Sequence, residues 1–600
     1  MTPATPTPLP KSVRLAWVAF GALSIAFHLW LIFSGLVPNL VARPLHMALA
    51  VPWVFLFPAR GKWHVILGAV LTIVGVGCCL WIVANEARLE DQYGALEGTW
   101  QRVIAAGLII TVLEMARRAI GWPLPVIAAL ALLYGLFGAS LPGEFGHPGL
   151  PLDSFLGTMI VAEGGLWGSL TGVSVNIVAI FVIMGAVLNA GEAGQGFMNL
   201  ASAAAGRLTG GAAKVSVLSS ALFGSISGSA SANVASTGAI TLPTMRKLGY
   251  PPRLAGAVEA VASSGGQIMP PLMGAGAFVM VELTGIPYTS IMAAALLPAL
   301  LYFATVWIGI NAYATRYDLS GIDAADQPAP RTVVITALFF AVPFAVLMER
   351  MFVAGLTPQY AAASAILVAT LLLIFDARLT IDIARTWKRL ETVALTAGQQ
   401  IATIAAIILC ATFVISVLAQ TGLGVKMTSL ILSAGGEQLW PALLLTGLAC
   451  LLLGMEVPTT AAYVICVSVA GPALQKLGLD PLVTHLFVFW FALLSTITPP
   501  VCGAVFIAAG MVEENWLRVA LTAMALGIGL YIIPLAMVAN PGLIALNDAP
   551  AHALGDFARV AAALAMISYA IIARRKLVTR TLLVAGGLAL AFAVPLWLTP

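Results

Sequence analysis

Apolar runs of membrane-spanning length recur throughout this chain, and they constrain its fold more than any other feature. Val13 to Ser34, Trp63 to Ala84 and Val103 to Ala116 are apolar over much of the roughly 20 residues that a helix needs to cross a bilayer. The chain is 60% hydrophobic and 9% charged, whereas soluble globular proteins average about 45–50% and 25%. We therefore expect an all-α polytopic membrane protein with about 15 transmembrane helices.

Basic residues near the ends of these runs predict the orientation of the chain, because they favour the cytoplasmic side. Lys11 and Arg14 precede the first run, so we expect a cytoplasmic N-terminus. Lys and Arg are absent from 119–206, which indicates an external connection with an interfacial helix within that stretch.

The uncharged segment from Val215 to Met245 is dense in small residues at its centre and is flanked by four basic residues: Lys214, Arg246, Lys247 and Arg253. A single crossing would leave basic groups outside, whereas a segment that enters and turns back keeps all four in the cytoplasm. We therefore expect a re-entrant hairpin over about 215–245. Unwound backbone at membrane depth is tolerated where protein buries it or where it lines a cavity, so the tip is a candidate site.

The chain repeats itself at an offset of 229 residues. Residues 243–252 (PTMRKLGYPP) are similar to residues 472–481 (PALQKLGLDP), and the same offset carries Pro270-Pro271 onto Pro499-Pro500. We count five spans between the two copies, and this odd number predicts that the second copy is inverted. Its own hairpin is expected over about 438–477, with a weaker basic signal that suits an external position.

Inverted repeats with interrupted helices are the architecture of secondary transporters, in which half-helix ends and exposed carbonyls bind ions and substrate. We expect each hairpin tip to face a helix break of its own copy: Ser225–Thr237 facing Ser263–Pro271, and Gly454–Thr460 facing Ser495–Pro500. A Pro-Pro step lacks two amide donors and disfavours helix before it, which frees carbonyls there. The substrate path is expected to run between the two hairpins.

Hydroxyls beside freed carbonyls suit Na⁺, a hard cation that prefers oxygen ligands. We expect the chain to use Na⁺, bound at two pseudo-symmetric sites, and no organic cofactor. The first would involve Ser229, Ser231, Asn233, Gly265, Gly266 and Met269, and the second Gly454, Pro458, Thr459, Thr460, Thr496 and Thr498. The alternative is that these small residues merely allow close packing of helices.

The residues expected to contact substrate are Ser227, Gly228, Ser263, Gln267 and Glu456. An unpaired acid at membrane depth costs about 2.5–3.5 kcal/mol or more, so Glu456 is either functional or close to the surface. The six cysteines fall inside apolar runs without metal-ligand spacing, and we expect buried thiols. The histidines share no spacing, which favours packing or surface roles over catalysis.

Three motifs carry a resemblance to a known family: GSISGSASANVASTG (224–238), GQIMPP (266–271) and LGMEVPTTAAY (453–463). They closely resemble the tripartite ATP-independent periplasmic (TRAP) transporters and, within them, the TAXI branch with fused membrane subunits. The resemblance implies five segments: a small-subunit-like four-helix unit (1–121), a linking and an external interfacial helix (122–171), large-subunit repeat 1 (172–330), large-subunit repeat 2 (331–540) and two extra spans (541–600).

The resemblance further implies sodium-driven uptake of an organic acid, delivered by a separate periplasmic TAXI-type substrate-binding protein. It implies an elevator-type ion-transporter-like fold in the bacterial inner membrane, surrounded by lipid, in which a monomeric fused permease works without an ATPase. The sequence contains no GxxxxGK[ST] phosphate loop. A net charge of +4 on 600 residues indicates no nucleic-acid partner.

Two other functions are considered. A stand-alone sodium/anion symporter of related fold would need no binding protein, and the four-span N-terminal unit argues against it. An intramembrane hydrolase or polyprenyl transferase would need convergent acid, base or metal-binding residues at membrane depth. The sequence shows no such convergence, so we do not expect an enzyme.

Overall fold

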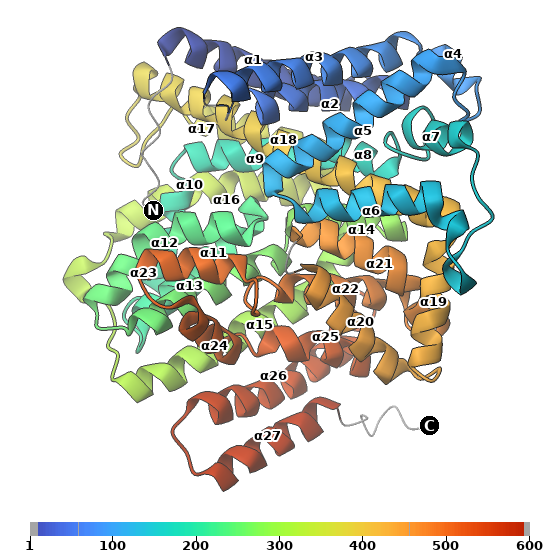
Figure 1. Ribbon diagram of the computed structural model, residues 1–600. Coiled ribbons are helices and arrows are strands. Elements are labelled where there is room, and N and C mark those ends of the chain that lie inside the picture. The colour runs from blue at the N-terminus through green and yellow to red at the C-terminus, as the bar shows by residue number, and fades with distance from the viewer. Residues whose placement is uncertain (1–9, 58, 60, 455–456, 593–600) are drawn as a thin grey trace. The chain divides into compact units, whose positions relative to one another are not determined.

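The computed structural model describes residues 10–57, 59, 61–454 and 457–592, without the side chain of Ser227 (Figure 1). These residues form helices and no β-strand. Nine helices within the described ranges are long and apolar enough to cross a bilayer. A helix pairs its own backbone groups, which lipid cannot do. The predicted all-α polytopic class is confirmed, and the total of about 15 spans stays a prediction.

The chain divides into two compact units, which are described separately. Unit 1 comprises residues 1–141, 148–192 and 339–420, and unit 2 comprises residues 142–147, 193–338 and 421–600. Two helices have residues in both units: α16 (Pro330–Phe352), and α18 (Ile383–Thr421), whose last residue lies in unit 2. The division into small-subunit-like and large-subunit-like segments stays a prediction.

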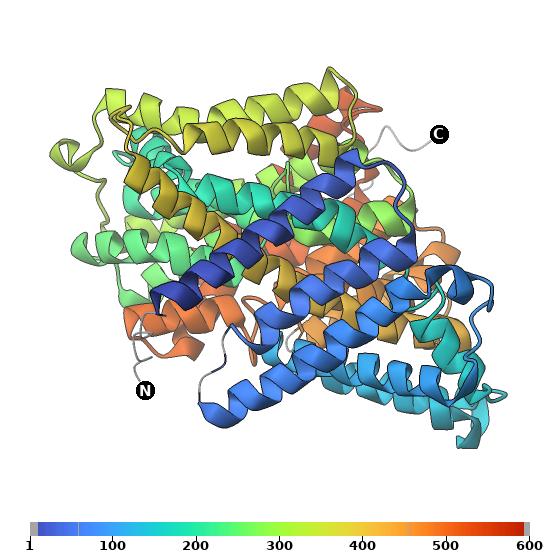
Figure 2. The ribbon, with the colours of Figure 1, turned by 90° about the horizontal axis from the view of Figure 1, so that it is seen from above.

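Unit 1 is built mainly from long apolar helices, with a few short ones between them. It holds α1 (Lys11–Phe33), α2 (Asn39–Phe55), α3 (Lys62–Ala84), α4 (Glu86–Glu90), α5 (Gly98–Ile120), α6 (Pro123–Phe137), α7 (Leu152–Ile160), α8 (Ser169–Val173), α9 (Ala179–Ala190), α17 (Pro358–Leu372) and nearly all of α18 (Ile383–Thr421). Helices α2, α3 and α5 pack side by side, in blue in Figure 2.

Ion pairs and glycines join the helices of unit 1. Arg14 on α1 pairs with Glu391 on α18 at 2.8 Å, and Arg389 on α18 pairs with Glu192. A Cβ on Gly21 would clash with the backbone of Ala394, so this glycine lets α1 lie directly against α18. Arg389 lies near the start of the 39-residue α18, where its guanidinium is partly buried and paired.

Unit 2 contains shorter helices, several of them only 10–17 residues long. It holds α10 (Ala193–Ala205), α11 (Gly211–Ser227), α12 (Ala230–Lys247), α13 (Pro252–Gly265), α14 (Gly274–Thr284), α15 (Tyr288–Tyr317), α19 (Leu423–Ala434), α20 (Leu439–Gly454), α21 (Thr459–Lys476), α22 (Pro481–Leu494), α23 (Gly503–Val512), α24 (Trp516–Leu526), α25 (Gly529–Ala539), α26 (Pro550–Ile572) and α27 (Leu577–Phe592). Apolar helices of this length are too short to span a bilayer alone.

The helix bounds of unit 2 reproduce the internal repeat. Helix α12 begins at Ala230 and α21 at Thr459, and α13 begins at Pro252 and α22 at Pro481, each 229 residues apart. The packing is exchanged between copies: α12 of the first copy packs on α23 of the second, and α14 packs on α21. Both Pro-Pro steps have cis peptide bonds.

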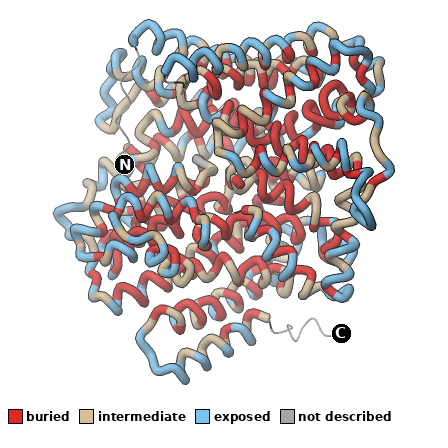
Figure 3. Tube along the Cα trace, in the orientation of Figure 1, coloured by how far each residue is buried: buried red, intermediate tan, exposed pale blue. Residues whose placement is uncertain are grey.

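The two predicted hairpins correspond to the helix pairs α11–α12 and α20–α21, in which the two helices pack against each other. Their bounds lie within a few residues of the predicted 215–245 and 438–477. Re-entry from opposite sides of the membrane stays a prediction from the basic residues. The core of unit 2 runs along α13 and α22, which are buried over most of their length, and buried residues are red in Figure 3.

The contact of Gly224 with Gly266 gives a test of the hairpin packing. A Cβ on Gly224 would meet the Cα of Gly266, so Gly224→Ala should lower the unfolding free energy by about 1–3 kcal/mol. All six cysteines are buried, as predicted, so a thiol-reactive dye can follow thermal unfolding of the detergent-solubilised chain.

The matched control is Gly510→Ala on α23, where an added Cβ meets no atom within 4 Å. Alanine is intrinsically the better helix residue by up to about 1 kcal/mol, so the control should unfold at or above the wild-type temperature. Equal unfolding temperatures for both variants would contradict the packing of α11 on the helix break.

Candidate functional site

The first hairpin tip lies directly against the first helix break. Gly228, at φ +61°, ends α11 in the left-handed conformation, and its backbone lies against the backbone of Gly274 at the start of α14. Gly224 lies against Gly266, with which the 3₁₀ turn Gly266–Ile268 begins. Glycine is required at these positions because backbone meets backbone.

Asn233 ties this tip to both neighbouring helices. Its side chain is fully buried, and its amide donates to the carbonyl of Ser220 on α11 at 3.0 Å and to that of Ser263 on α13 at 3.4 Å. The Ser263 carbonyl belongs to the last turn of α13, where helical partners run out. Asn233, which lies on α12, therefore serves the backbone of α11 as well as that of the break.

Two tyrosines that the sequence reasoning missed supply further donors to the break. The Tyr302 hydroxyl donates to the carbonyl of Val261 at 2.7 Å. The Tyr288 hydroxyl donates to the carbonyl of Pro271 and lies 3.1 Å from that of Leu272. The Pro271 carbonyl at the end of the break and the Val261 carbonyl of α13 are therefore already satisfied by protein.

The second hairpin meets the second break in a similar way. Gly454, the last residue of α20, packs against the carbonyl of Ala492 and the side chain of Ser495. In the break, the Thr498 hydroxyl donates to the carbonyl of Leu494 at 2.7 Å and lies 2.6 Å from the Tyr531 hydroxyl.

The two breaks are joined to each other inside unit 2. The Thr496 hydroxyl of the second break lies 2.8 Å from the Ser264 hydroxyl of α13, to which it donates. Ser264 is fully buried and Thr496 half-buried. The two copies of the repeat therefore meet through polar groups at the points where their helices are interrupted.

A fully buried carboxylate, Glu259, lies beside the first break and was not among the predicted site residues. Its oxygens accept hydrogen bonds from four hydroxyls, those of Ser216, Thr237, Thr241 and Ser263. A lone carboxylate at membrane depth costs about 2.5–3.5 kcal/mol on insertion scales. The available signal was Glu259 itself, which is the one charged residue in the stretch from 254 to 281.

The predicted residues of the first sodium site gather around one tip and one break. Ser229 caps α12 by accepting from the Ala232 amide, and Ser231 is half-buried near Gly503. Asn233 lies between α11 and α13, as described above. Gly265 packs against the Tyr302 ring, and Met269 follows the 3₁₀ turn.

The remaining predicted residues are distributed less evenly. Pro458 precedes α21, which Thr459 and Thr460 begin, and both threonines are half-buried. Gln267 is buried in the 3₁₀ turn Gly266–Ile268, and the Ser263 hydroxyl donates to Glu259. Glu456 and the side chain of Ser227 lie outside the described residues.

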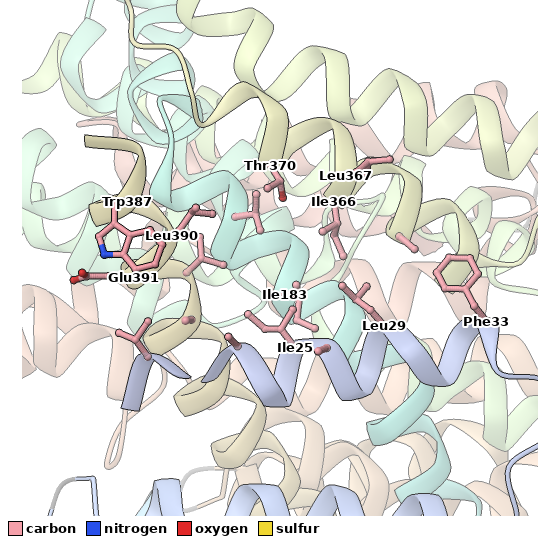
Figure 4. A pocket seen from close by; sticks show the side chains of 17 residues that line it. Ile25, Leu29, Phe33, Ile183, Ile366, Leu367, Thr370, Trp387, Leu390 and Glu391 are labelled. Carbon is pink, nitrogen blue, oxygen red and sulfur yellow. The ribbon is translucent and has the colours of Figure 1, made fainter. Parts of the chain in front are cut away.

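Unit 1 holds an apolar cavity of about 670 Å³ between α1, α9, α17 and α18 (Figure 4). Its lining includes Ile25, Leu29 and Ile366, and Glu391 at its edge is the acid already paired with Arg14. Such a lining offers little to a carboxylate, so the cavity is not the site that the hydroxyls and carbonyls of unit 2 indicate.

Unit 1 also contains a buried chain of hydrogen bonds that joins two histidines and a serine. Ring nitrogens of His28 and His46 lie 2.8 Å apart, and His46 lies 3.0 Å from the Ser174 hydroxyl. Within the described residues, no carboxylate forms a hydrogen bond with these three side chains, and all three are buried. These hydrogen bonds join α1, α2 and the turn that begins at Ser174. We interpret their role as structural.

The bond between Thr496 and Ser264 gives a test of the junction of the two breaks. A double-mutant cycle of Thr496→Val and Ser264→Ala should show a coupling energy of about 0.5–1.5 kcal/mol, the worth of one buried hydrogen bond. The measurement is the unfolding free energy, in mixed detergent micelles, of the wild type, the two single variants and the double variant. Thr244, whose hydroxyl bonds only its own helix, serves as the control partner, and Thr244→Val with Ser264→Ala should be additive. Additivity of the first pair as well would argue against the junction.

Comparison with known proteins supplies the identity of the fold. The family model of the tripartite ATP-independent periplasmic transporter, DctM component, matches residues 108–551. The chain is 22% identical to the uncharacterized protein YgiK of Salmonella typhimurium, with 70% of this chain and 92% of that protein covered. It is 25% identical to the C4-dicarboxylate TRAP transporter large permease protein DctM of Pseudomonas aeruginosa, over 56% of this chain and 76% of that protein.

A third relative is the isethionate TRAP transporter permease protein DctMQ of Oleidesulfovibrio alaskensis, 24% identical over 70% of this chain and 66% of that protein. Relatives whose names state a function are transporter permeases and not enzymes. Because the family model matches well over half of the residues, this chain belongs to the DctM component family of the tripartite ATP-independent periplasmic transporters.

Proposed function

We propose that this chain is the membrane permease of a sodium-coupled, substrate-binding-protein-dependent importer of organic acids, of the TAXI type, with small and large membrane subunits in one chain. The observation that carries the proposal is the arrangement in unit 2. Two helical hairpins related by an offset of 229 residues each place a tip against an interrupted helix, and Thr496 joins the two breaks. Paired interrupted helices form the ion and substrate sites of secondary transporters.

The oxygens at the two tips support sodium as the coupling ion. Neutral hydroxyls and carbonyls suit a hard monovalent cation. The half-buried Ser231 and Thr459 stand at equivalent ends of α12 and α21, at the start of the second helix of each hairpin. Tyr288 occupies the Pro271 carbonyl of the first break and Tyr302 occupies the Val261 carbonyl of α13, so the proposed sodium ligands are the remaining backbone oxygens and the hydroxyls of the tip.

The substrate class and the binding protein rest on the family and its named relatives. The relatives reported above carry the names of C4-dicarboxylate and isethionate transporters, both organic acids. The family name describes a tripartite periplasmic system, which supports delivery by a periplasmic binding protein to a bacterial inner-membrane permease. The TAXI assignment rests on the motifs over 224–238, 266–271 and 453–463.

An elevator-type motion would use the two units. Both hairpins and both breaks belong to unit 2, whereas the N-terminal helices α1, α2, α3 and α5 belong to unit 1. A unit that carries the whole site can move as a body without dismantling it. Unit 1 would then be the scaffold.

Uptake into proteoliposomes separates this function from its alternatives. With the purified chain, an inward sodium gradient, a panel of labelled carboxylates and the cognate binding protein, uptake should require both the gradient and the binding protein. Gradient-driven uptake without the binding protein would favour a stand-alone symporter. Consumption of a substrate without vectorial uptake would favour an enzyme, and equal uptake in choline would reject sodium coupling.

Single substitutions at the two tips test the sodium sites. Ser229→Ala and Thr459→Val each remove one hydroxyl, and each should raise the sodium concentration needed for half-maximal uptake about tenfold, as expected for one lost ligand of about 1.4 kcal/mol. Thr244→Val removes a hydroxyl that bonds only the Ile240 carbonyl of α12, and it should leave sodium dependence unchanged. An unchanged sodium dependence in both tip variants would refute the assignment.

A further inference from the structure

The carboxylate of Glu259 is held by hydroxyls from three helices. Ser216 on α11 donates at 2.8 Å, Thr237 and Thr241 on α12 donate to opposite oxygens, and Ser263 on α13 lies at 3.3 Å. All four side chains and the carboxylate are buried. Glu259 therefore joins both helices of the first hairpin to the helix that ends at the first break.

The carboxyl group of Glu259 has no cationic partner in the described part of unit 2. Helix α13 packs on α11, α12, α15, α23, α24 and the 3₁₀ turn after it. None of the titratable or charged groups of these elements forms an ion pair or hydrogen bond with Glu259. On α11, α12 and α13 they are Lys214, Arg246, Lys247 and Arg253, and on α15 and α24 they are Tyr288, Tyr302, Tyr313, Arg316, Tyr317 and Arg518.

The hydroxyl partners can change direction. Thr237 and Thr241 each carry one hydroxyl proton, and each has a second acceptor in its own helix, the carbonyl of Asn233 at 2.8 Å and that of Thr237 at 3.0 Å. When the carboxylate is charged, both threonine hydroxyls donate their protons to hydrogen bonds with Glu259. When it is neutral, the threonines can return to these backbone acceptors, and one of their oxygens can accept the new carboxyl proton.

We propose that Glu259 takes up and releases a proton during the transport cycle. The charged carboxylate holds the second helix of the first hairpin tightly against α11 and α13, and the neutral carboxyl group holds it less tightly. The proposal deepens the proposed function, on which it rests, by adding a proton to the coupling ions. On uptake, a proton from water forms an O–H bond at one carboxylate oxygen. On release this O–H bond breaks, the proton returns to water, and the four hydroxyls donate to the carboxylate again.

A proton fits the geometry of Glu259 better than a sodium ion does. The four hydroxyls contact the carboxylate directly, so no ion lies between them and its oxygens. The Thr237 hydroxyl also contacts Asn233, a buried residue of the tip. A change of charge at Glu259 can therefore reach the tip through a single shared hydroxyl.

The second copy of the repeat lacks this device. The offset of 229 places Val488 of α22 at the position of Glu259, and Val488 is buried in an apolar helix. One carboxylate in the pair of copies means one proton at most from this position in each cycle.

Infrared difference spectra of the full chain in liposomes, recorded in choline buffer between alkaline and acid pH, test the proposal without substrate. The wild type should show the carbonyl stretch of a buried protonated carboxyl at acid pH, and Glu259→Gln should lack it. Glu282→Gln, at an exposed acid on α14, should retain it. A band of equal size in Glu259→Gln would overturn the proposal.

A second variant keeps the carboxyl and removes one donor. In Thr241→Val the charged form loses a hydrogen bond, so the protonated band should persist to higher pH, whereas Thr244→Val should behave as the wild type. An unchanged titration in Thr241→Val would contradict the role of the hydroxyls.

Binding of labelled Na⁺ to the same samples separates the proton from the sodium sites. Loss of Na⁺ binding in Glu259→Gln, together with no protonated band in the wild type at any pH, would make Glu259 a sodium ligand and overturn the proposal. A band that depends on Glu259 supports it even if the sodium-driven uptake proposed above fails.

Discussion

Unpaired backbone groups in an apolar surrounding are the constraint on which the rest of unit 2 depends. Each Pro-Pro step interrupts a helix and leaves carbonyls that lipid cannot satisfy. Around the first break, side chains from neighbouring helices donate hydrogen bonds to backbone carbonyls; they are Asn233, Tyr288 and Tyr302. Asn233 holds the first hairpin against its break, and glycines permit backbone contact at both hairpins, so the architecture and the candidate site have one cause.

The duplicated architecture carries an asymmetric chemistry. Helix bounds and exchanged packing follow the offset of 229 residues closely. The polar groups do not, because Glu259 and Asn233 of the first copy correspond to Val488 and Ala462 of the second. In transporters built from inverted repeats the site lies where the two repeats meet, but ions of different kinds require different ligands. The asymmetry is what the proposed use of both sodium and a proton would need.

The polar and apolar features of the two units suit different roles. In unit 2 the described polar groups converge on two helix breaks that Thr496 and Ser264 connect. In unit 1 the cavity is lined by apolar side chains, and the charges at its edge are already paired. Buried His28 and His46 bond to each other and to Ser174, which fixes three segments of unit 1 without offering a reactive group to a substrate.

The sequence by itself determined the all-α membrane class, the repeat and the positions of both hairpins. These depend on local composition: apolar runs, Pro-Pro steps and small residues leave their mark wherever they occur along the chain. It also pointed to Gly224, Gly266 and Asn233 through motifs at the tip and the break. It placed Glu456 in the site, a position outside the described residues.

Only the tertiary structure decided which partners meet. Glu259 lies 18 to 43 residues from Thr241, Thr237 and Ser216, and the Tyr302 hydroxyl reaches a carbonyl 41 residues away. No periodicity links such residues, because their proximity follows from how α11, α12, α13 and α15 pack. Hydrogen bonding is short-ranged and directional, so the chemistry of the site depends on packing that no local pattern encodes.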